Sequence, residues 1–235
     1  MTVRRILALG GGGFSVEPEN PLLDRFALSL TGKARPRVCF LPTASGDAEA
    51  SVAKFRFSFG ALPCEPSALS LFRPHTADLE GFLLEQDLIW VGGGNTRSLL
   101  ALWREWGLDR ILRTAWERGI VLAGVSAGGI CWFEEGITDS VPGELRPIRA
   151  LGLLPGSFCP HYDGEAGRRP AFHRLLAEGR LGAGWAADDG AGLLFEGTRL
   201  ARVVSSRPAA MAHRLEALNG RVVETPLPAE FLGSA

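Results

Sequence analysis

The chain has 235 residues, of which 46% are hydrophobic and 22% charged, and its formal net charge at pH 7 is −1. This balance is typical of a globular α/β protein and excludes a disordered chain. The basic residues are scattered and no apolar stretch approaches ~20 residues, so neither a nucleic-acid footprint nor a membrane span is expected.

Short apolar runs alternate with longer segments of helical periodicity through the first half of the chain. Each run is continuous rather than alternating, which indicates strands covered on both faces. We predict strands over 5–9, 37–41, 68–72, 88–91 and 120–124, and helices over 20–30, 48–59, 77–84, 96–105, 108–118 and 127–133. This order predicts an α/β fold of three layers, with a largely parallel sheet flanked by helices.

The pattern changes after residue 133. The stretch 139–160 is rich in proline and glycine, and a helix is predicted over 170–178. Short strands separated by turns are predicted over 184–187, 192–196, 200–205 and 221–225. We expect these to be short antiparallel strands near the C-terminus of a single domain that spans residues 1–235.

The segment Gly124-Val-Ser-Ala-Gly128 follows a predicted strand and precedes a predicted helix. In this setting G-x-S-x-G is typical of a nucleophile elbow, whose strained turn exposes the serine hydroxyl at the carboxyl edge of the sheet. The helix start favours an oxyanion, so the N–H of Ala127 is the first predicted oxyanion donor. The plainer interpretation is a tight turn in which Ser126 only caps the helix.

A second glycine loop at residues 92–94 ends the preceding strand and leads into a helix capped by Asn95 or Thr96. Ligands of parallel sheets bind outside the carboxyl ends of the strands, so Gly93 is the second predicted oxyanion donor. A phosphate cradle and a plain turn are the alternatives, and no Gly-Lys-Ser/Thr follows this loop as a phosphate cradle of the Walker type would require. The glycine run at 10–13 lacks the third glycine of a dinucleotide fingerprint, and we interpret it as a structural turn.

A serine nucleophile needs a base, because its hydroxyl is protonated at neutral pH while imidazole titrates near ~6.5. His161 follows a buried-looking segment and begins a polar cluster, as at the end of a strand entering a loop. The remaining histidines lie in a surface-like turn or in charged, helix-like stretches and are expected to be solvated: His75, His173 and His213. His161 is therefore the predicted base.

Four aspartates are candidates for the carboxylate that orients this base: Asp139, Asp163, Asp188 and Asp189. Asp163, two residues from His161, would approach Nδ1 at an awkward angle. Asp188 and Asp189 follow another predicted strand and can approach from outside. Asp189 is preferred among them.

Together these motifs resemble peptidase E, the aspartyl dipeptidase family of serine peptidases, with cyanophycinase as a more distant relative. The resemblance rests on segments 91–96, 124–128, 138–139 and 153–161 and on the acidic residue before Gly190. It implies a fold like that of class I glutamine amidotransferases, which is flavodoxin-like, with serine in place of their cysteine. The family's nucleophile, base and late glutamate correspond to Ser126, His161 and Asp189, so aspartate stands where glutamate is usual.

The resemblance also implies a substrate and the residues that bind it. In the family, an arginine in the loop after the histidine holds the substrate's aspartate side chain, a role that falls here to Arg168 or Arg169. Asn95 is assigned to substrate binding, and Asp139 matches another acidic position of the family and is expected to be structural. The expected activity is serine-type hydrolysis of small peptides, dipeptides with N-terminal aspartate above all, without a metal or organic cofactor.

Two rival functions stay open. An esterase of the α/β-hydrolase kind places the acid before the histidine, which would require Asp139 or Asp163 with His173 or His213. A non-catalytic binding relative would keep the scaffold without the chemistry. The stretch 142–147 is a candidate lid loop over the site.

The four cysteines form no CxxC pair, and Cys39 and Cys131 lie in apolar segments typical of buried free thiols. The apolar stretch at residues 6–9 is too short for the h-region of a signal peptide. We therefore expect a reduced, cytoplasmic protein whose partner is a small peptide substrate, and the sequence is compatible with a homo-oligomer.

Overall fold

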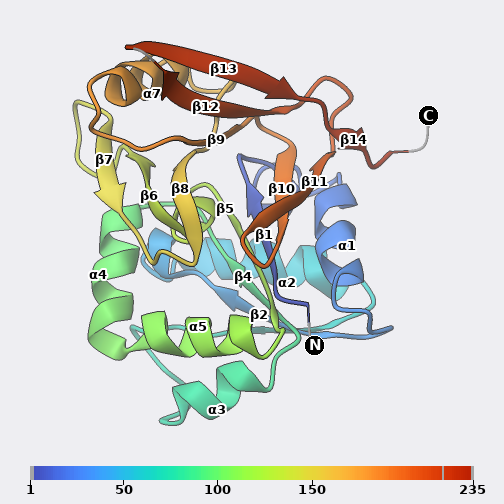
Figure 1. The fold of residues 1–235 in the computed structure, drawn as a ribbon. Coiled ribbons are helices and arrows are strands. Elements are labelled where there is room, and N and C mark those ends of the chain that lie inside the picture. The colour runs from blue at the N-terminus through green and yellow to red at the C-terminus, as the bar shows by residue number, and fades with distance from the viewer. Residues whose placement is uncertain (1–2, 219, 234–235) are drawn as a thin grey trace.

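The computed structural model describes residues 3–218 and 220–233, whose strands form two sheets (Figure 1). The larger sheet has eight strands in the order β14-β11-β10-β1-β5-β4-β2-β3. Its strands are β1 (Arg5–Leu9), β2 (Arg37–Leu41), β3 (Glu65–Ala68), β4 (Leu88–Val91), β5 (Val121–Val125), β10 (Ala191–Glu196), β11 (Arg199–Ser205) and β14 (Glu230–Phe231). Strands β1 to β5 pair in parallel, whereas β10 pairs antiparallel with both β1 and β11. The predicted α/β fold with a largely parallel sheet is confirmed.

Helices cover both faces of this sheet (Figure 1). They are α1 (Leu22–Ser29), α2 (Glu49–Gly60), α3 (Leu79–Leu84), α4 (Thr96–Trp106) and α5 (Leu108–Glu117). In β1, Leu7 and Leu9 belong to the hydrophobic cluster with α1 and α2, while Ile6 and Ala8 belong to the cluster with α3, α4 and α5. The continuous apolar strands are therefore buried on both faces because successive side chains point to opposite sides. Every helix among the described residues is too short or too polar to cross a membrane.

The second sheet has six strands in the order β13-β12-β9-β8-β6-β7. They are β6 (Phe133–Thr138), β7 (Arg146–Arg149), β8 (Leu154–Cys159), β9 (Gly184–Ala187), β12 (Ala212–Leu218) and β13 (Arg221–Leu227). Helix α7 (Arg168–Ala177) packs its apolar side against this sheet through Phe172, Leu175 and Leu176. Of the four strands predicted near the C-terminus, β9 and β13 belong to this mixed sheet, whereas β10 and β11 extend the eight-stranded sheet as an antiparallel pair.

Aromatic side chains join the two sheets. Phe195 of β10, in the larger sheet, packs edge-on against Trp185 of β9 and Phe133 of β6, with ring centroids 5.7 Å apart in both pairs. Phe133 stacks in turn on Phe158 of β8 at 4.9 Å. Such contacts contribute burial and ring geometry together, so they fix the smaller sheet against the larger one.

Two predicted elements and one stretch rich in proline and glycine differ from what the sequence led us to expect. The strand predicted over 68–72 lies at Glu65–Ala68, because the Asp47 carboxylate binds the N–H groups of residues 71 and 72 and the hydroxyl of Ser70. The helix predicted over 127–133 ends at Ile130, since β6 begins at Phe133 and pairs with β8. The stretch 139–160 contains β7 and β8 because pairing with β6 overrides its turn-forming residues.

The expectation that His173 and His213 are solvated helical residues is wrong for His213 and incomplete for His173. His213 lies on β12 between β9 and β13 and is only 8% exposed. His173 does lie on α7, but its Nε2 is 2.6 Å from Oε2 of Glu224 on β13. Helix-forming residues in the segment 212–218 hid a strand that tertiary pairing stabilises.

Candidate active site

Strand ends of both sheets converge on one site. Ser126 follows β5 and residues 92–94 follow β4, both at the carboxyl edge of the larger sheet. His161 follows β8 and Asp189 follows β9, at the carboxyl ends of two parallel neighbours in the smaller sheet. Ser126 and His161 line the same cavity of about 330 Å³. The structure thus brings the predicted nucleophile and base together from two sheets.

The backbone of Ser126 is strained, with φ 57° and ψ −115°. A non-glycine residue in such a conformation costs about 1–3 kcal/mol, and the surrounding turn must impose it. The flanking glycines allow this turn: a Cβ on Gly124 would lie 3.0 Å from the Cα of Gly128, and one on Gly128 would lie 2.8 Å from the carbonyl carbon of Val91. The chain therefore turns sharply enough to present the hydroxyl at the sheet edge.

The two predicted oxyanion donors lie beside Ser126. Ala127 is the first residue of the one-turn helix α6 (Ala127–Ile130), and a Cβ built on Gly93 would lie 3.2 Å from the Cβ of Ser126. Within residues 3–218 and 220–233, neither N–H has a hydrogen-bond acceptor in the protein. Backbone N–H groups placed in this way beside a serine are of the kind that can stabilise an oxyanion.

The imidazole of His161 is held by Asp189. Its Nδ1 lies 2.6 Å from Asp189 Oδ1, which leaves Nε2 as the ring nitrogen for Ser126. The hydrogen bond from His161 holds the pKa of the Asp189 carboxyl below its ordinary value, although partial burial acts in the opposite direction. The nearby positive charges of Arg207 and Arg168 also lower this pKa. The arrangement favours a carboxylate that orients the ring and stabilises its protonated form.

The other three aspartates have different partners. Asp163 accepts a hydrogen bond from the backbone N–H of Asp189, with 2.7 Å between N and Oδ1. Asp188 accepts one from the N–H of Met211. Asp139 is exposed and lies 3.5 Å from Arg168. Asp189 is thus the one of these four whose carboxylate contacts the ring of His161.

The glycine run at 10–13 packs against the His161–Asp189 pair. Gly11 forms a bridge with Asp189, and its carbonyl accepts a hydrogen bond from the N–H of Gly190 at 3.0 Å. A Cβ on Gly11 would overlap the Asp189 carboxylate and lie 3.0 Å from Nδ1 of His161. A Cβ on Gly164 would overlap the same carboxylate from the other side. The loop that we interpreted as a turn is therefore also one wall of the His161–Asp189 pair.

The residues predicted to bind substrate lie outside the lining of the Ser126 cavity. Arg168 has a buried side chain that contacts Glu165 at 2.7 Å and the carbonyl of Ile137 at 3.1 Å. Arg169 pairs with Glu224 at 2.9 Å. Asn95 caps α4: its side-chain oxygen accepts from the N–H of residue 98, and its amide donates to the carbonyl of residue 140.

Sequence reasoning missed the cation that does line the cavity. Lys54, on α2, lines it together with Ser126 and His161. The remaining lining residues are small, hydroxyl-bearing or apolar: Phe14, Ser15, Val16, Phe40, Ser45, Ala50, Ser51, Gly92, Gly93 and Val125. The one signal in the sequence was the rarity of lysine, since all but two of the 25 basic residues are arginine.

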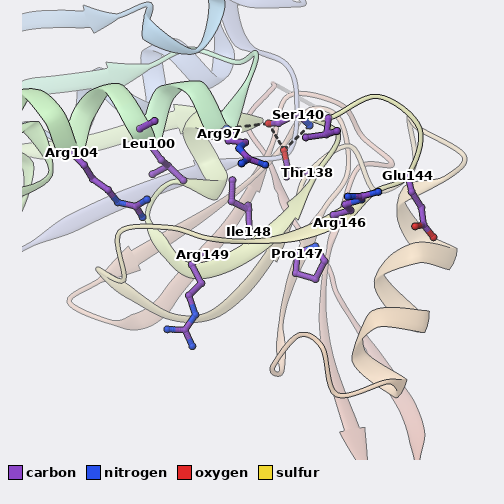
Figure 2. A pocket seen from close by; sticks show the side chains of 12 residues that line it. Arg97, Leu100, Arg104, Thr138, Ser140, Glu144, Arg146, Pro147, Ile148 and Arg149 are labelled. Atoms are coloured by element: carbon purple, nitrogen blue, oxygen red, sulfur yellow. Dashed lines mark hydrogen bonds between the residues drawn. The ribbon is translucent and has the colours of Figure 1, made fainter.

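A larger hollow of about 430 Å³ lies between α4 and β7. Figure 2 shows arginine side chains reaching it from both elements, with Thr138 and Ser140 hydrogen-bonded at one end. Its lining includes Arg97, Arg104, Glu144 and Ile148, but neither Ser126 nor His161. This hollow lacks the strained serine and the histidine–aspartate pair, so the smaller cavity is the candidate active site.

The cysteines and the acidic residues suggest no second reactive centre. All four cysteines are free and buried, and burial raises the pKa of the Cys39 thiol to about 12 and of Cys64 to about 11. Such thiols are poor nucleophiles at neutral pH. In the part of the chain that the structure describes, no three His, Cys, Asp or Glu side chains gather as ligands for a metal ion.

The chain is similar to known peptidases. Residues 6–203 match the family described as Peptidase family S51. The chain is 54% identical over 231 residues to the uncharacterized peptidase YgaJ of Bacillus subtilis, covering 98% of this chain and 100% of the relative. It is 35% identical over 137 residues to a probable alpha-aspartyl dipeptidase of Drosophila melanogaster, covering 56% and 55% of the two chains. The crystal structure of a peptidase from an acI-B1 actinobacterium shares the fold, with a TM-score of 0.71, 20% identity and coverage of 97% and 95%.

Proposed function

The chain belongs to peptidase family S51, and on that basis we propose that it is a serine peptidase whose catalytic triad is Ser126, His161 and Asp189. Family membership makes the protein a peptidase and therefore a hydrolase. One observation supports the serine mechanism. Ser126 and His161 line the same cavity, and Nδ1 of His161 lies 2.6 Å from Oδ1 of Asp189.

In this proposal Ser126 Oγ attacks the carbonyl carbon of the scissile peptide bond while His161 Nε2 takes its proton. The carbonyl oxygen becomes an oxyanion, which accepts hydrogen bonds from the N–H groups of Ala127 and Gly93. The C–N bond then breaks, and His161 returns the proton to the leaving amine. Water, deprotonated by His161, hydrolyses the remaining ester and regenerates the serine.

Asp189 supports each of these steps without touching the substrate. It accepts the Nδ1 hydrogen bond, fixes the tautomer whose Nε2 is basic, and stabilises the imidazolium that forms on proton transfer. Its lowered pKa keeps the carboxylate ionised at neutral pH, as this role requires. An aspartate serves here because the close approach of Gly11 and Gly164 leaves little room for a longer side chain.

We propose small peptides, and dipeptides with N-terminal aspartate in particular, as the substrates. A cavity of about 330 Å³ is at the small end of ligand sites, which favours a short peptide over a protein. The printed name of the Drosophila relative supports the aspartyl preference. The rival esterase arrangement has less support, because His173 and His213 both contact Glu224 and neither lines the Ser126 cavity.

The test is hydrolysis of Asp-Xaa, Glu-Xaa and neutral dipeptides by the wild-type protein and by Ser126→Ala. We expect selective cleavage of Asp-Xaa by the wild type and none by the variant, whose circular dichroism spectrum should be unchanged. A fluorophosphonate should label the wild-type protein at Ser126. Equal turnover by Ser126→Ala would refute the assignment of the nucleophile.

A further inference from the structure

The described lining of the candidate active site contains one lysine and no arginine. Of the described residues that line the cavity, only Lys54 and His161 carry titratable groups, and no carboxylate is among them. His161 is committed to Asp189 through Nδ1. Lys54 is therefore the source of positive charge on the substrate side of the cavity.

Lys54 has no acidic partner among the described residues. The polar contact of its Nζ is the carbonyl oxygen of Ser15, at 3.5 Å. The other lysine, Lys33, lies 2.7 Å from Oδ1 of Asp87 in an ion pair far from this site. The arginines after His161 are likewise engaged, Arg168 with Glu165 and Arg169 with Glu224. An unpaired ammonium thus lines the cavity of Ser126, whereas nearby guanidinium groups are already neutralised.

Lys54 shares the lining of the cavity with apolar and hydroxyl-bearing side chains. Phe14, Val16 and Phe40 form apolar parts of the same lining, and Ser15 and Ser51 supply hydroxyl groups beside them. Lys54 itself is exposed, so its flexible stem can bring the ammonium to a carboxylate that enters the cavity. The hydroxyls can donate hydrogen bonds to the same anion.

We propose that Lys54 determines the specificity of this site by binding a carboxylate of the peptide substrate. The inference rests on the proposed function, since it takes the cavity of Ser126 as the substrate site. The carboxylate has two sources in an aspartyl dipeptide, the side chain of the first residue and the C-terminus. A lysine presents a single point charge on a flexible stem, so it accepts a carboxylate without the fixed bidentate geometry that arginine imposes.

The test compares Lys54→Met with wild type and with Lys33→Met, which removes the other lysine. The substrates are Asp-Ala, Asn-Ala and the C-terminal amide of Asp-Ala. A charged hydrogen bond is worth about 10- to 100-fold, so we expect Lys54→Met to lose about that factor in kcat/KM for Asp-Ala. Lys54→Arg should retain most of the activity, and Lys33→Met should behave as wild type.

The substrate pairs identify the source of the carboxylate. If Lys54 binds the side chain, Lys54→Met should no longer distinguish Asp-Ala from Asn-Ala but should still respond to amidation. If it binds the C-terminus, the variant should ignore amidation and still prefer Asp-Ala. Wild-type preferences of both kinds in a folded Lys54→Met protein would overturn the inference while leaving the proposed function intact.

A binding measurement separates failure of this inference from failure of the proposed function. Isothermal titration of Asp-Ala into Ser126→Ala, with and without Lys54→Met, requires no turnover. Weaker binding in the double variant would support Lys54 even if the wild-type protein cleaved none of the peptides. Equal binding by both variants, or none by either, would refute the role of Lys54.

Discussion

Replacing Gly11 with alanine should disable catalysis without unfolding the protein. The added Cβ would overlap Oδ1 of Asp189, lie 2.8 Å from its Cγ and lie 3.0 Å from Nδ1 of His161. Gly11 is not among the residues with positive φ, so the conflict is one of space rather than of backbone conformation. The carboxylate has to move, and its 2.6 Å contact with His161 is lost.

The magnitude follows from what that contact does. A hydrogen bond to a charged group contributes about 1.5–3 kcal/mol, and loss of the orienting acid in a serine triad lowers kcat by as much as ~10⁴-fold. We expect Gly11→Ala to reduce kcat by ~10²- to 10⁴-fold with little change in KM, because the substrate cavity is untouched. The assay is steady-state hydrolysis of Asp-Ala, with the rate of fluorophosphonate labelling as a second measure.

Gly60→Ala is the matched control. Gly60 is the last residue of α2, a Cβ there would meet nothing within 4 Å, and alanine is the better helix former. Its activity should equal that of wild type and its melting temperature should not fall. If Gly11→Ala kept wild-type kcat and labelling rate, the close approach of this loop would have no catalytic consequence and the reasoning would be wrong.

Two further predictions concern stability. Burial raises the pKa of Asp24 to about 7 even though it accepts a hydrogen bond from the N–H of Phe14, so the folded state holds a proton that the unfolded state releases near pH 4. The free energy of unfolding should therefore fall by a few kcal/mol as the pH rises from about 4 to 7. In urea unfolding at pH 5 and pH 8, the free energy of unfolding of Asp24→Asn should change less between the two pH values than that of the wild type. Glu224 accepts hydrogen bonds from Tyr162 and lies 2.6 Å from His173, so Glu224→Gln should cost about 1–3 kcal/mol in urea unfolding; an unchanged midpoint would contradict this.

Sequence patterns predicted the elements whose apolar runs are unambiguous. The bounds of β1, β2 and β4 agree with the predicted ranges, because strands buried on both faces have few other interpretations. β12 was missed because its residues favour a helix and its strand depends on pairing with β9 and β13. Local propensity cannot reveal such a strand, since the partners lie outside any short window.

In the candidate site, too, some residues are marked by local sequence and others only by tertiary contacts. Ser126 could be found from a local motif, and His161 from its place after an apolar segment. The contact of Gly11 with Asp189 joins residues that lie far apart in the chain, and no local pattern marks it. The place of Lys54 in the cavity likewise depends on how α2 packs against β3 and the turn at residues 13–15, which becomes visible only in three dimensions.

The proposed nucleophile follows a strand of one sheet, and the proposed base and acid follow strands of the other. The reactivity of Ser126 should therefore depend on how the two sheets are aligned. A change at the Phe195, Trp185 and Phe133 contact that let the smaller sheet slide would separate His161 from Ser126 while every helix and strand stayed intact. In such a variant, heat or denaturant should abolish the peptidase activity before the circular dichroism signal shows any loss of secondary structure. The rate at which a fluorophosphonate labels Ser126 would therefore report on motion between the two sheets.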